Sequence, residues 1–586
     1  MRVREECKPD SEDVQIQGPR RDPHQELMLL EKLTGNYSLF AFYLSDSALS
    51  GDGEVIFVGS GIYDAFDDLF LLLGMPRPSS SRPWTVAEAK YELSRIDGES
   101  LTGYERQLFD YISERIFGDE TGIAVDLSFS PEIYLHTNDN TVLEEQWNYG
   151  YTRRNPILYL GVNAWNGGFA FHTELTAGNG RAGSKDTFET LGEMVASQGR
   201  VFEGVGAAES EYGRPGELKD VKVVKESAIY SPFFAFNGLG TTDNEIPRIA
   251  TLTFAGESSS FGIYRAQKVW GNNRIGNFIF DDHVGRYTYI TYKNFNSKFS
   301  FETTIMFPEV YLGGNHDTVD YGSKRRLFLA HRFDIPMGES MKLTVSENVM
   351  YLASYFFDFQ YLNPATIYHN NINSSQFNAI AHVEYEYAPL PGLAIYAQLA
   401  IDQGTVPFFE KTKEDQAIGI SLGSEYAFAL SKGICDVNLE VLYATPALYR
   451  RDAPDFVITD SSQISGGYLS IPSFTYIGLK YGGDTFAVRL DGEYKAIDTK
   501  FYGSETLLVK GSFDLYQKYT PASFVGEILS GEPKLSSITE FGAEKSFVIL
   551  KTDCSAFANI SLVYDNSEFD CQVAIGFKAS LSTRKK

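Results

Sequence analysis

The 586-residue sequence has few cysteines and tryptophans and no long apolar run. Its cysteines, Cys7, Cys435, Cys554 and Cys571, show neither CxxC nor metal-type spacing. We therefore expect no disulfide framework, and only a pairing of Cys554 with Cys571 stays open. No apolar run reaches the roughly 18–20 residues that a membrane-spanning helix needs. Residues 1–26 are charged throughout and lack an apolar core, so no signal peptide is evident.

Basic charge is also scarce. The sequence has 77 Asp and Glu against 51 Lys and Arg, a formal net charge of −26. Phosphate recognition requires basic surfaces, so this balance excludes nucleic acid as a partner.

The sequence shows no pattern typical of catalysis or of a metal site. The histidines lack the i,i+2 or i,i+4 spacing of paired metal ligands: His283, His316, His331, His369 and His382. No nucleophile with a base and an orienting group accompanies the carboxylates. We expect a protein that is not an enzyme and that carries no metal and no cofactor.

Aromatic residues are abundant instead, at 14% of the chain, and 52 glycines accompany them. Tyr and Phe favour pleated strands, and glycine favours tight turns. This composition predicts a mainly β protein.

Residues 55–120 are the exception, because they repeat apolar positions at helical spacing. In residues 62–74 the apolar side chains form one stripe, which Gly74 and Pro76 end. Thr85–Glu88 and Thr102–Glu105 each have the form of a capping box, which indicates the start of a helix. We predict a small helical module over 55–120. Residues 1–54 are left as an unassigned, disordered leader or tail.

From about Gly122 the apolar period changes to two. In "FDCQVAIGFKASL", residues 569–581, every odd position is apolar and the even positions are polar or small. Strands of a transmembrane barrel alternate in this way, with an apolar outside and a polar lumen. A soluble β-sandwich also alternates, but in units of about 100 residues with a repeat at that scale, and we find none.

We therefore predict a large transmembrane antiparallel β-barrel over residues 121–581, with about 16–18 strands and a basic tail at 582–586. Residues 569–581 are expected to pair with the first strand and close the cylinder, since an open edge is not tolerated in lipid. The segment 176–228, rich in glycine and charge, is expected to be a long loop.

Two blocks of sequence are more specific than this pattern. One runs from Arg325 to His369 and includes "HRFD" and "YLNP"; it is followed by "PLPGLAIYAQLAIDQ" at 389–403. The other is residues 246–282, with Gly262, Trp270, Gly271, Gly276 and Asp281 in order and Arg265 one position short of the pattern. Together they resemble the Wzi-like family of outer-membrane capsule assembly proteins.

The resemblance implies a monomeric barrel in outer-membrane lipid, inserted by the barrel assembly machinery, with a periplasmic helical module and a role in attaching surface polysaccharide. Separately from the resemblance, the aromatic, amide and histidine side chains in and next to the two blocks suit a sugar subsite, and they are the candidate glycan-binding residues: Trp270, Asn272, Tyr361, Asn363, Tyr368, His369 and Asn370. The structural alternative for Asn363-Pro364 is the end of a strand, because Pro supplies no N–H.

The strand period also places charged side chains inside the barrel. Arg332 and Asp334 share the face opposite His331 and Phe333, and they are expected to form an ion pair in the lumen. Glu384 and Glu386 are expected to line the lumen as well. These residues leave a second function open, a porin-like channel for saccharides or other small solutes. A soluble multi-domain β protein is the third alternative.

Overall fold

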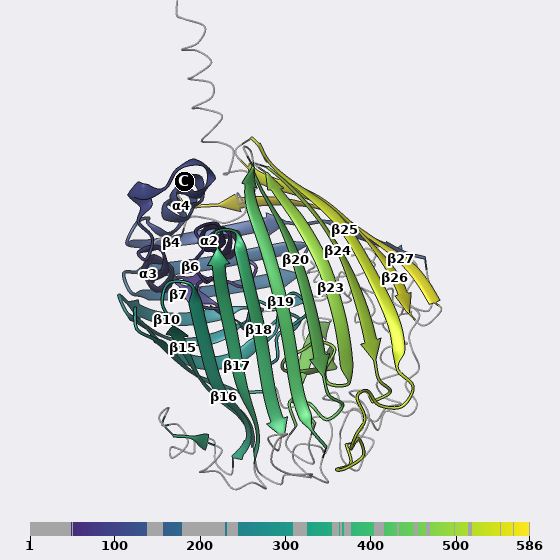
Figure 1. Cartoon of the computed structure of the whole chain (residues 1–586). Helices are drawn as coiled ribbons and strands as arrows, with labels where there is room; N and C mark the ends of the chain where they lie inside the picture. The colour runs from purple at the N-terminus through teal and green to yellow at the C-terminus, as the bar shows by residue number, and fades with distance from the viewer. Residues whose placement is uncertain are drawn as a thin grey trace, which may run out of the picture.

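The described residues form one closed antiparallel β-barrel with three α-helices packed at one end (Figure 1). The fold was obtained as a computed structural model. The residues that it describes are 49, 51–137, 156–177, 229–230, 244–245, 247–308, 325–353, 363, 366–368, 377–403, 415–430, 433–450, 455–464, 469–496, 498–513, 519–550, 552–565 and 568–584. The predicted long loop at 176–228 and most of residues 1–54 lie outside them.

The helices, together with three short strands, come first in the chain. They are β1 (Val55–Ile56), α2 (Gly61–Leu72), β2 (Ser81–Arg82), β3 (Trp84–Thr85), α3 (Val86–Leu93), a 3-10 turn (Gly98–Ser100) and α4 (Gly103–Ile116). Gly74 follows α2 with φ +68°, a conformation that glycine adopts without strain, and so ends the helix as expected. Thr85 caps α3 by accepting from the Glu88 N–H. Thr102 is the N-cap of α4, so the second predicted helix start is confirmed, but its side chain makes no capping hydrogen bond and the capping box itself is not formed.

The barrel strands follow in sequence order. They are β4 (Thr121–Phe129), β5 (Glu132–His136), β6 (Leu158–Asn166), β7 (Phe169–Ala177), β8 (Ile229–Tyr230), β9 (Asn244–Glu245), β10 (Ala250–Gly256), β11 (Ser259–Ala266), β13 (Tyr287–Phe295), β14 (Ser300–Met306), β15 (Arg325–Pro336), β16 (Met341–Ala353), β17 (Phe377–Leu390), β18 (Leu393–Gln403), β19 (Ala417–Leu430), β20 (Gly433–Ala444), β23 (Thr485–Ala496), β24 (Thr499–Lys510), β25 (Lys534–Ile549), β26 (Thr552–Asp565) and β27 (Glu568–Ser582). Two further pairs are not part of the wall: β12 (Val269–Trp270) pairs with β2, and β21 (Val457–Ile464) pairs with β22 (Leu469–Tyr476).

The described strands close into an 18-stranded barrel, at the upper end of the predicted range. The sheet contains 21 segments. However, β4 and β5 share one position in the wall, and β8 and β9 are two-residue extensions of neighbouring ladders. The last strand, β27, pairs antiparallel with both β4 and β5. The predicted closure by residues 569–581 is therefore confirmed, and separate sandwiches are excluded.

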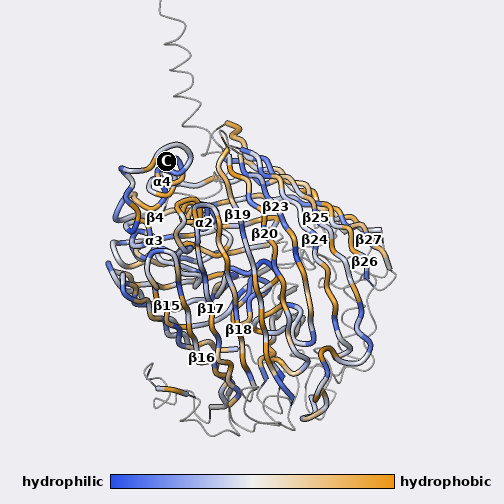
Figure 2. The backbone as a smooth tube through the Cα atoms, viewed as in Figure 1, coloured by the Kyte–Doolittle hydropathy of each residue, from blue (hydrophilic) through white to orange (hydrophobic). Residues whose placement is uncertain are grey.

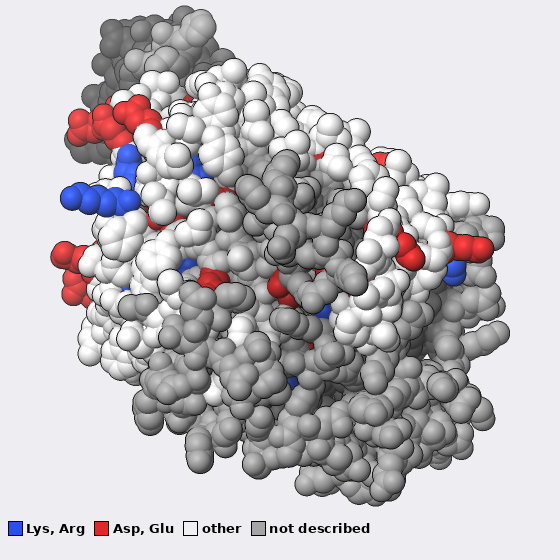
Figure 3. All heavy atoms as spheres, turned by 60° about the horizontal axis from the view of Figure 1, so that its bottom comes forward, with Lys and Arg blue, Asp and Glu red and all other residues white. Residues whose placement is uncertain are grey.

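The two faces of the wall differ in polarity as the period of two requires, and apolar and polar stretches alternate along the strands in Figure 2. On β27, Phe569, Ile575 and Leu581 are 55%, 51% and 53% exposed on the outside, whereas Asp570 and Gln572 are buried on the inside. Much of the wall visible in Figure 3 is free of charged side chains. Among the described residues, no helix is long and apolar enough to cross a bilayer.

The two ends of the barrel are also different. The end that carries the helices has short turns, such as Gly167–Gly168 between β6 and β7, whereas the opposite end carries the long connections (Figure 1). The amide of Gly392, in the β17–β18 turn, donates to the Leu71 carbonyl of α2 at 2.7 Å. The helices are therefore attached to the short-turn end. Cys435, Cys554 and Cys571 are free thiols.

A charge on the outer wall tests whether this face meets lipid. Leu422 lies near the middle of β19 and is 57% exposed on the outside. We expect Leu422→Arg to destabilise the protein in lipid vesicles by about 2–4 kcal/mol, the cost of an arginine on the lipid face of a barrel. Ile528→Arg, in an exposed loop position, is the matched control and should have little effect. Urea unfolding in vesicles measures both; equal, small effects would mean that the Leu422 face meets water.

Candidate functional site in the barrel lumen

The lumen contains an extended segment that connects α2 with α3. We call residues 77–83 the lumen segment; apart from the short β2 strand it has no regular structure. Its side chains are buried from Arg77 through Ser81, and they contact inward-facing side chains of at least four strands. A second segment, residues 268–284 between β11 and β13, lies beside it, because β12 pairs with β2. Together the two segments fill the middle of the described lumen.

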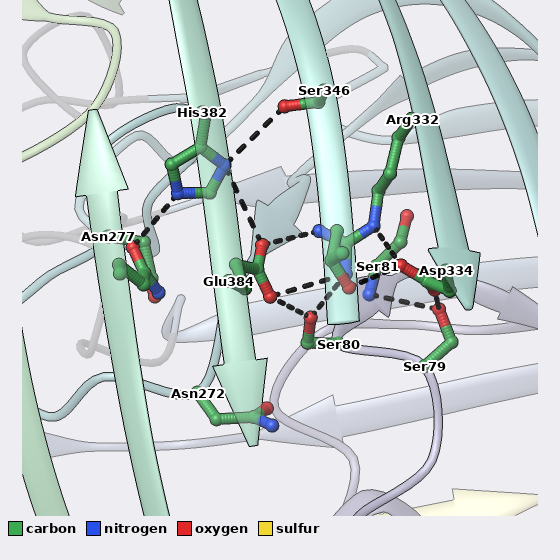
Figure 4. A network of polar contacts seen from close by, with 12 residues as sticks. Ser79, Ser80, Ser81, Asn272, Asn277, Arg332, Asp334, Ser346, His382 and Glu384 are labelled. Carbon is green, nitrogen blue, oxygen red and sulfur yellow. Dashed lines mark hydrogen bonds and ion pairs between the residues drawn. The ribbon is translucent and has the colours of Figure 1, made fainter. Parts of the chain in front are cut away.

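Arg332 is the centre of one group of contacts in the lumen (Figure 4). This side chain is 1% exposed, and its guanidinium donates at 2.8 Å to Asp334 Oδ1 and at 2.6 Å to Glu384 Oε1. It also donates at 2.6 Å to Ser80 Oγ of the lumen segment. Ser79 donates to Asp334 at 2.8 Å, and Ser80 donates to Glu384 at 2.7 Å. A planar fork of five donors suits such a site, because it satisfies two carboxylates and a hydroxyl at once.

Arg77 is the centre of a second group. Its guanidinium lies 2.8 Å from Glu386 Oε1 and 2.8 Å from Glu425 Oε2. Glu425 also accepts from Arg274 of residues 268–284, at 3.0 Å. Both carboxylates stabilise the charged form of Arg77 against burial, and its pKa lies above the usual value. Glu425 of the wall therefore contacts both the lumen segment and residues 268–284.

Lysines of the wall satisfy the backbone of the lumen segment. Lys342 Nζ donates to the carbonyls of Arg77 and Pro78, both at 2.6 Å. Lys293 Nζ donates to the carbonyls of Ser81 and Pro83, at 2.9 and 3.0 Å. A buried segment without regular structure leaves backbone carbonyls without partners in a β-sheet, and a buried carbonyl that lacks a hydrogen bond destabilises the fold. The ammonium groups supply these partners, so the segment fits in the lumen without strand pairing along its length.

Glu88, on α3, couples the helical module to the wall through Lys293, whose ammonium lies at 3.1 Å. Burial raises the pKa of Glu88 to about 8, against the opposing effect of Lys293. A glutamate in the unfolded chain titrates near pH 4.3, so between about pH 4.3 and about pH 8 the folded protein binds the extra proton. Stability should therefore fall as the pH rises through this window, by up to about 1.4 kcal/mol per pH unit. Urea unfolding across this range should show this slope, and Glu88→Gln should flatten it; an unchanged slope would contradict the assignment.

The four side chains predicted for the lumen lie there together: Arg332, Asp334, Glu384 and Glu386. Their partners were missed by the sequence reasoning, namely Arg77, the serines 79–81, Lys293, Glu302, Lys342 and Glu425. Inward-facing charges on strands were a visible signal for the wall residues. The lumen segment gave no such signal, because "PRPSSSRP" has the composition of an ordinary linker.

Four of the residues predicted to bind a glycan are described by the structure, namely Trp270, Asn272, Asn363 and Tyr368. Trp270 lies inside the barrel and is fully buried; its ring packs edge-on against Phe280, with 5.0 Å between ring centres. Asn272 lies near it in sequence but donates to Glu386, at 3.4 Å. Tyr361, His369 and Asn370 lie outside the described residues, and Asn363 is exposed.

Tyr368 lies on the outer wall of the barrel, where it is buried against His331 with 5.0 Å between ring centres. His331 pairs there with Glu347 at 3.1 Å. This corrects the sequence-based expectation for two rings: Trp270 and Tyr368 offer no exposed face to a sugar, because each is covered by its own packing.

The long-loop end has a different cleft, between β24 and β25. It has a volume of about 320 Å³ and is lined by Ser512, Phe513, Thr520, Ser523, Phe524, Glu527, Ser530 and Gly531. Two buried aspartates organise this loop. Asp415 accepts from the Ser523 and Phe524 amides at 3.1 and 2.8 Å, and Asp484 accepts from the Ser530 amide at 2.8 Å. The cleft therefore presents hydroxyls, a carboxylate and the partly exposed Phe524 on a fixed backbone.

Comparison with known proteins supports the fold. No protein-family model and no curated protein matches the sequence. Among solved structures, Escherichia coli Wzi, described as an outer-membrane protein involved in group 1 capsule assembly and a carbohydrate-binding β-barrel, matches with a TM-score of 0.51 at 12% identity, over 88% of this chain and 97% of that one. Pseudomonas aeruginosa OprD matches with a TM-score of 0.37 at 8% identity, over 79% of this chain and 96% of that one.

The closed wall with its apolar outside defines a barrel of the outer-membrane type, and segments of its own chain occupy the middle of the described lumen. Within this class, the chain has a Wzi-like fold.

Proposed function

We propose that this protein resides in the outer membrane and takes part in the surface attachment or assembly of a capsular or exopolysaccharide. It acts as a closed scaffold, without catalysis and without a resident metal or cofactor. The observation that carries this proposal is the filled lumen within a Wzi-like fold. Arg77, Arg332 and the wall lysines hold the lumen segment in place, which suits a scaffold better than a solute channel.

The proposal includes an orientation and a set of partners. Outer-membrane barrels have short turns on the periplasmic side and long loops outside. The helical module is then periplasmic, and the cleft between β24 and β25 faces the cell exterior. We further propose that the barrel is a monomer surrounded by outer-membrane lipid and inserted by the barrel assembly machinery.

The external cleft is the proposed contact for the polysaccharide. Aromatic rings stack on the apolar faces of sugars, while hydroxyls and carboxylates bind sugar hydroxyls. Phe524 and Glu527 are the side chains we assign to these two tasks. Phe513 is buried beneath Phe524, with 4.8 Å between ring centres, and supports it.

The first experiment is fractionation of the native cell followed by a gel without boiling. We expect the protein in the outer membrane, with the heat-modifiable migration of a barrel. The purified protein should then bind the surface polysaccharide isolated from the same cells. Phe524→Ala should weaken this binding about tenfold, as loss of about 1.4 kcal/mol would. Val525→Ala, an exposed neighbour outside the cleft lining, is the control. A folded barrel that binds no polysaccharide would refute the proposal.

A further inference from the structure

A cavity separate from the charge network lies inside the barrel, on the side of β4, β6, β7 and β10. It has a volume of about 450 Å³. The chain around β1 and Ser60 forms one side of it, and inward-facing residues of β4, β6, β7, β10, β26 and β27 form the other. This volume is within the range of about 300–1,000 Å³ that is typical of small-molecule sites. Asp126, Asn163 and Lys578 on its lining keep partial exposure, so the cavity is open to solvent.

Three side chains on neighbouring strands form a hydrogen-bonded chain in this cavity. Asn163 Nδ2 donates to Asp126 Oδ2 at 2.7 Å, and Asn163 Oδ1 lies 2.7 Å from His172 Nδ1. A carboxylate only accepts, so the amide nitrogen faces Asp126 and the amide oxygen faces His172. The proton of a neutral His172 is therefore on Nδ1, and Nε2 carries a lone pair.

That lone pair has no hydrogen-bond donor. His172 is 5% exposed, and its Nε2 has no hydrogen-bond partner among the described residues. Glu174 Oε2 is 3.6 Å away, and it is itself an acceptor. Asp126 Oδ1, also buried, is without a donor in the described part of the chain. Buried acceptors without donors are costly, so this arrangement favours a ligand that brings several donors.

The remaining lining narrows the class of ligand. Charges of both signs line the cavity: Glu54, Asp126, Glu174 and Asp553 are acidic, whereas Arg248, Lys578 and Arg584 are basic, and Arg584 pairs with Glu54. A charged ligand of either sign would therefore meet groups of its own sign. The described residues contain no group of three or more His, Cys, Asp or Glu side chains suited to a metal ion. Neutral hydroxyl donors satisfy the acceptors without these conflicts. Tyr159 and Phe57 add aromatic surface, and the Phe57 ring lies 4.6 Å from the His172 ring.

We propose that this cavity is a second carbohydrate site, which binds a neutral, polyhydroxylated sugar unit through His172 Nε2, Glu174 and Asp126. The inference rests on the proposed function for the kind of ligand, but it concerns a different place: the lumen near the helical module, not the external loops. A glycan-assembly protein would thereby hold a sugar unit on each side of its filled lumen.

The test uses the full chain in detergent and two neutral probes, methyl α-D-mannoside and methyl β-D-galactoside, observed by saturation-transfer NMR and calorimetry. His172→Phe keeps a ring but removes the acceptor. We expect it to raise the Kd of the bound glycoside about tenfold. Ser580→Phe, which fills the cavity from β27, should abolish binding. His331→Phe on the outer wall is the matched control and should leave the Kd unchanged.

Heat-modifiable migration of each variant shows that the barrel is folded. Glycoside binding that neither variant alters, or no binding of either probe, would overturn the inference, since water alone would then satisfy the acceptors. The surface polysaccharide is tested on the same variants. If it binds the wild type while the glycosides do not, this inference fails and the proposed function stands. If the glycosides bind at His172 and the polysaccharide does not bind the protein, the proposed function fails and the sugar site in the cavity stands.

Discussion

Replacing Arg332 with methionine will lower the free energy of unfolding by about 3–5 kcal/mol. Methionine fills a similar volume but removes a charge that is 1% exposed and that contacts Asp334, Glu384 and Ser80. Asp334 and Glu384 then stay buried with much of their compensation lost. Breaking a buried ion pair on one side costs far more than the intact pair contributes, because the remaining charge is not solvated. Urea unfolding in detergent, followed by tryptophan fluorescence, measures the change.

Two further variants separate charge from geometry. Arg332→Lys keeps the charge but loses the planar fork, so its loss should lie between that of methionine and the wild type. Adding Asp334→Asn and Glu384→Gln to Arg332→Met should recover much of the stability, because no buried charge is then unpaired. Arg106→Met, which breaks an exposed Arg–Asp pair on α4, is the matched control and should leave the midpoint unchanged. A midpoint for Arg332→Met equal to the wild type would show that water reaches this part of the lumen.

In planar bilayers the wild-type protein will show no stepwise conductance, and Glu386→Ala/Glu425→Ala will show openings. Arg77 contacts both carboxylates at 2.8 Å, and Glu425 also holds Arg274. Without them the guanidinium of Arg77 is a buried, unpaired charge, and its solvation favours movement of the lumen segment into water. The conformation that fills the lumen is then less populated, and ions can pass.

The control is a second pair of glutamates, Glu99→Ala/Glu114→Ala, on the exposed surface of the helical module. This double variant should show no stepwise conductance, as is expected of the wild type. Open steps in the wild type would favour the porin-like channel over the scaffold. A silent but folded Glu386→Ala/Glu425→Ala barrel would mean that Lys342, Lys293 and Arg332 hold the lumen segment without Arg77.

The residues that the sequence brought into view were those whose role depends on a local period. Phe569 to Leu581 alternate over a single strand, and the contrast between lipid outside and a polar lumen decides which face each side chain takes. The same reasoning placed Arg332 and Asp334 on the inner face. The starts of α3 and α4 were predicted correctly, since Thr85 and Thr102 are their N-caps, but the Thr102 side chain makes no capping hydrogen bond. A capping box also requires a backbone geometry that the spacing does not contain.

The glycan residues show the opposite case. Trp270 and Tyr368 belong to motifs that resemble a family, and rings in loops are reasonable sugar platforms. Whether these rings are exposed, however, depends on how they pack against Phe280 and His331. No local pattern in the sequence predicts these two contacts. The chain of Asp126, Asn163 and His172 was invisible for the same reason, because three strands must lie side by side before these groups meet.

By itself, the sequence determined that this chain forms a closed barrel with an apolar outer face, preceded by a helical module. Both follow from the sequence because the alternation in strands and the spacing in helices are properties of neighbouring residues. Only the tertiary structure decided that the lumen is filled. Ser80 and Glu384 are 304 residues apart in the chain, and Arg77 and Glu386 are 309 apart. A linker of proline and serine becomes a buried segment only when the folded wall supplies the carboxylates that pair Arg77 and the ammonium groups that satisfy the segment's carbonyls.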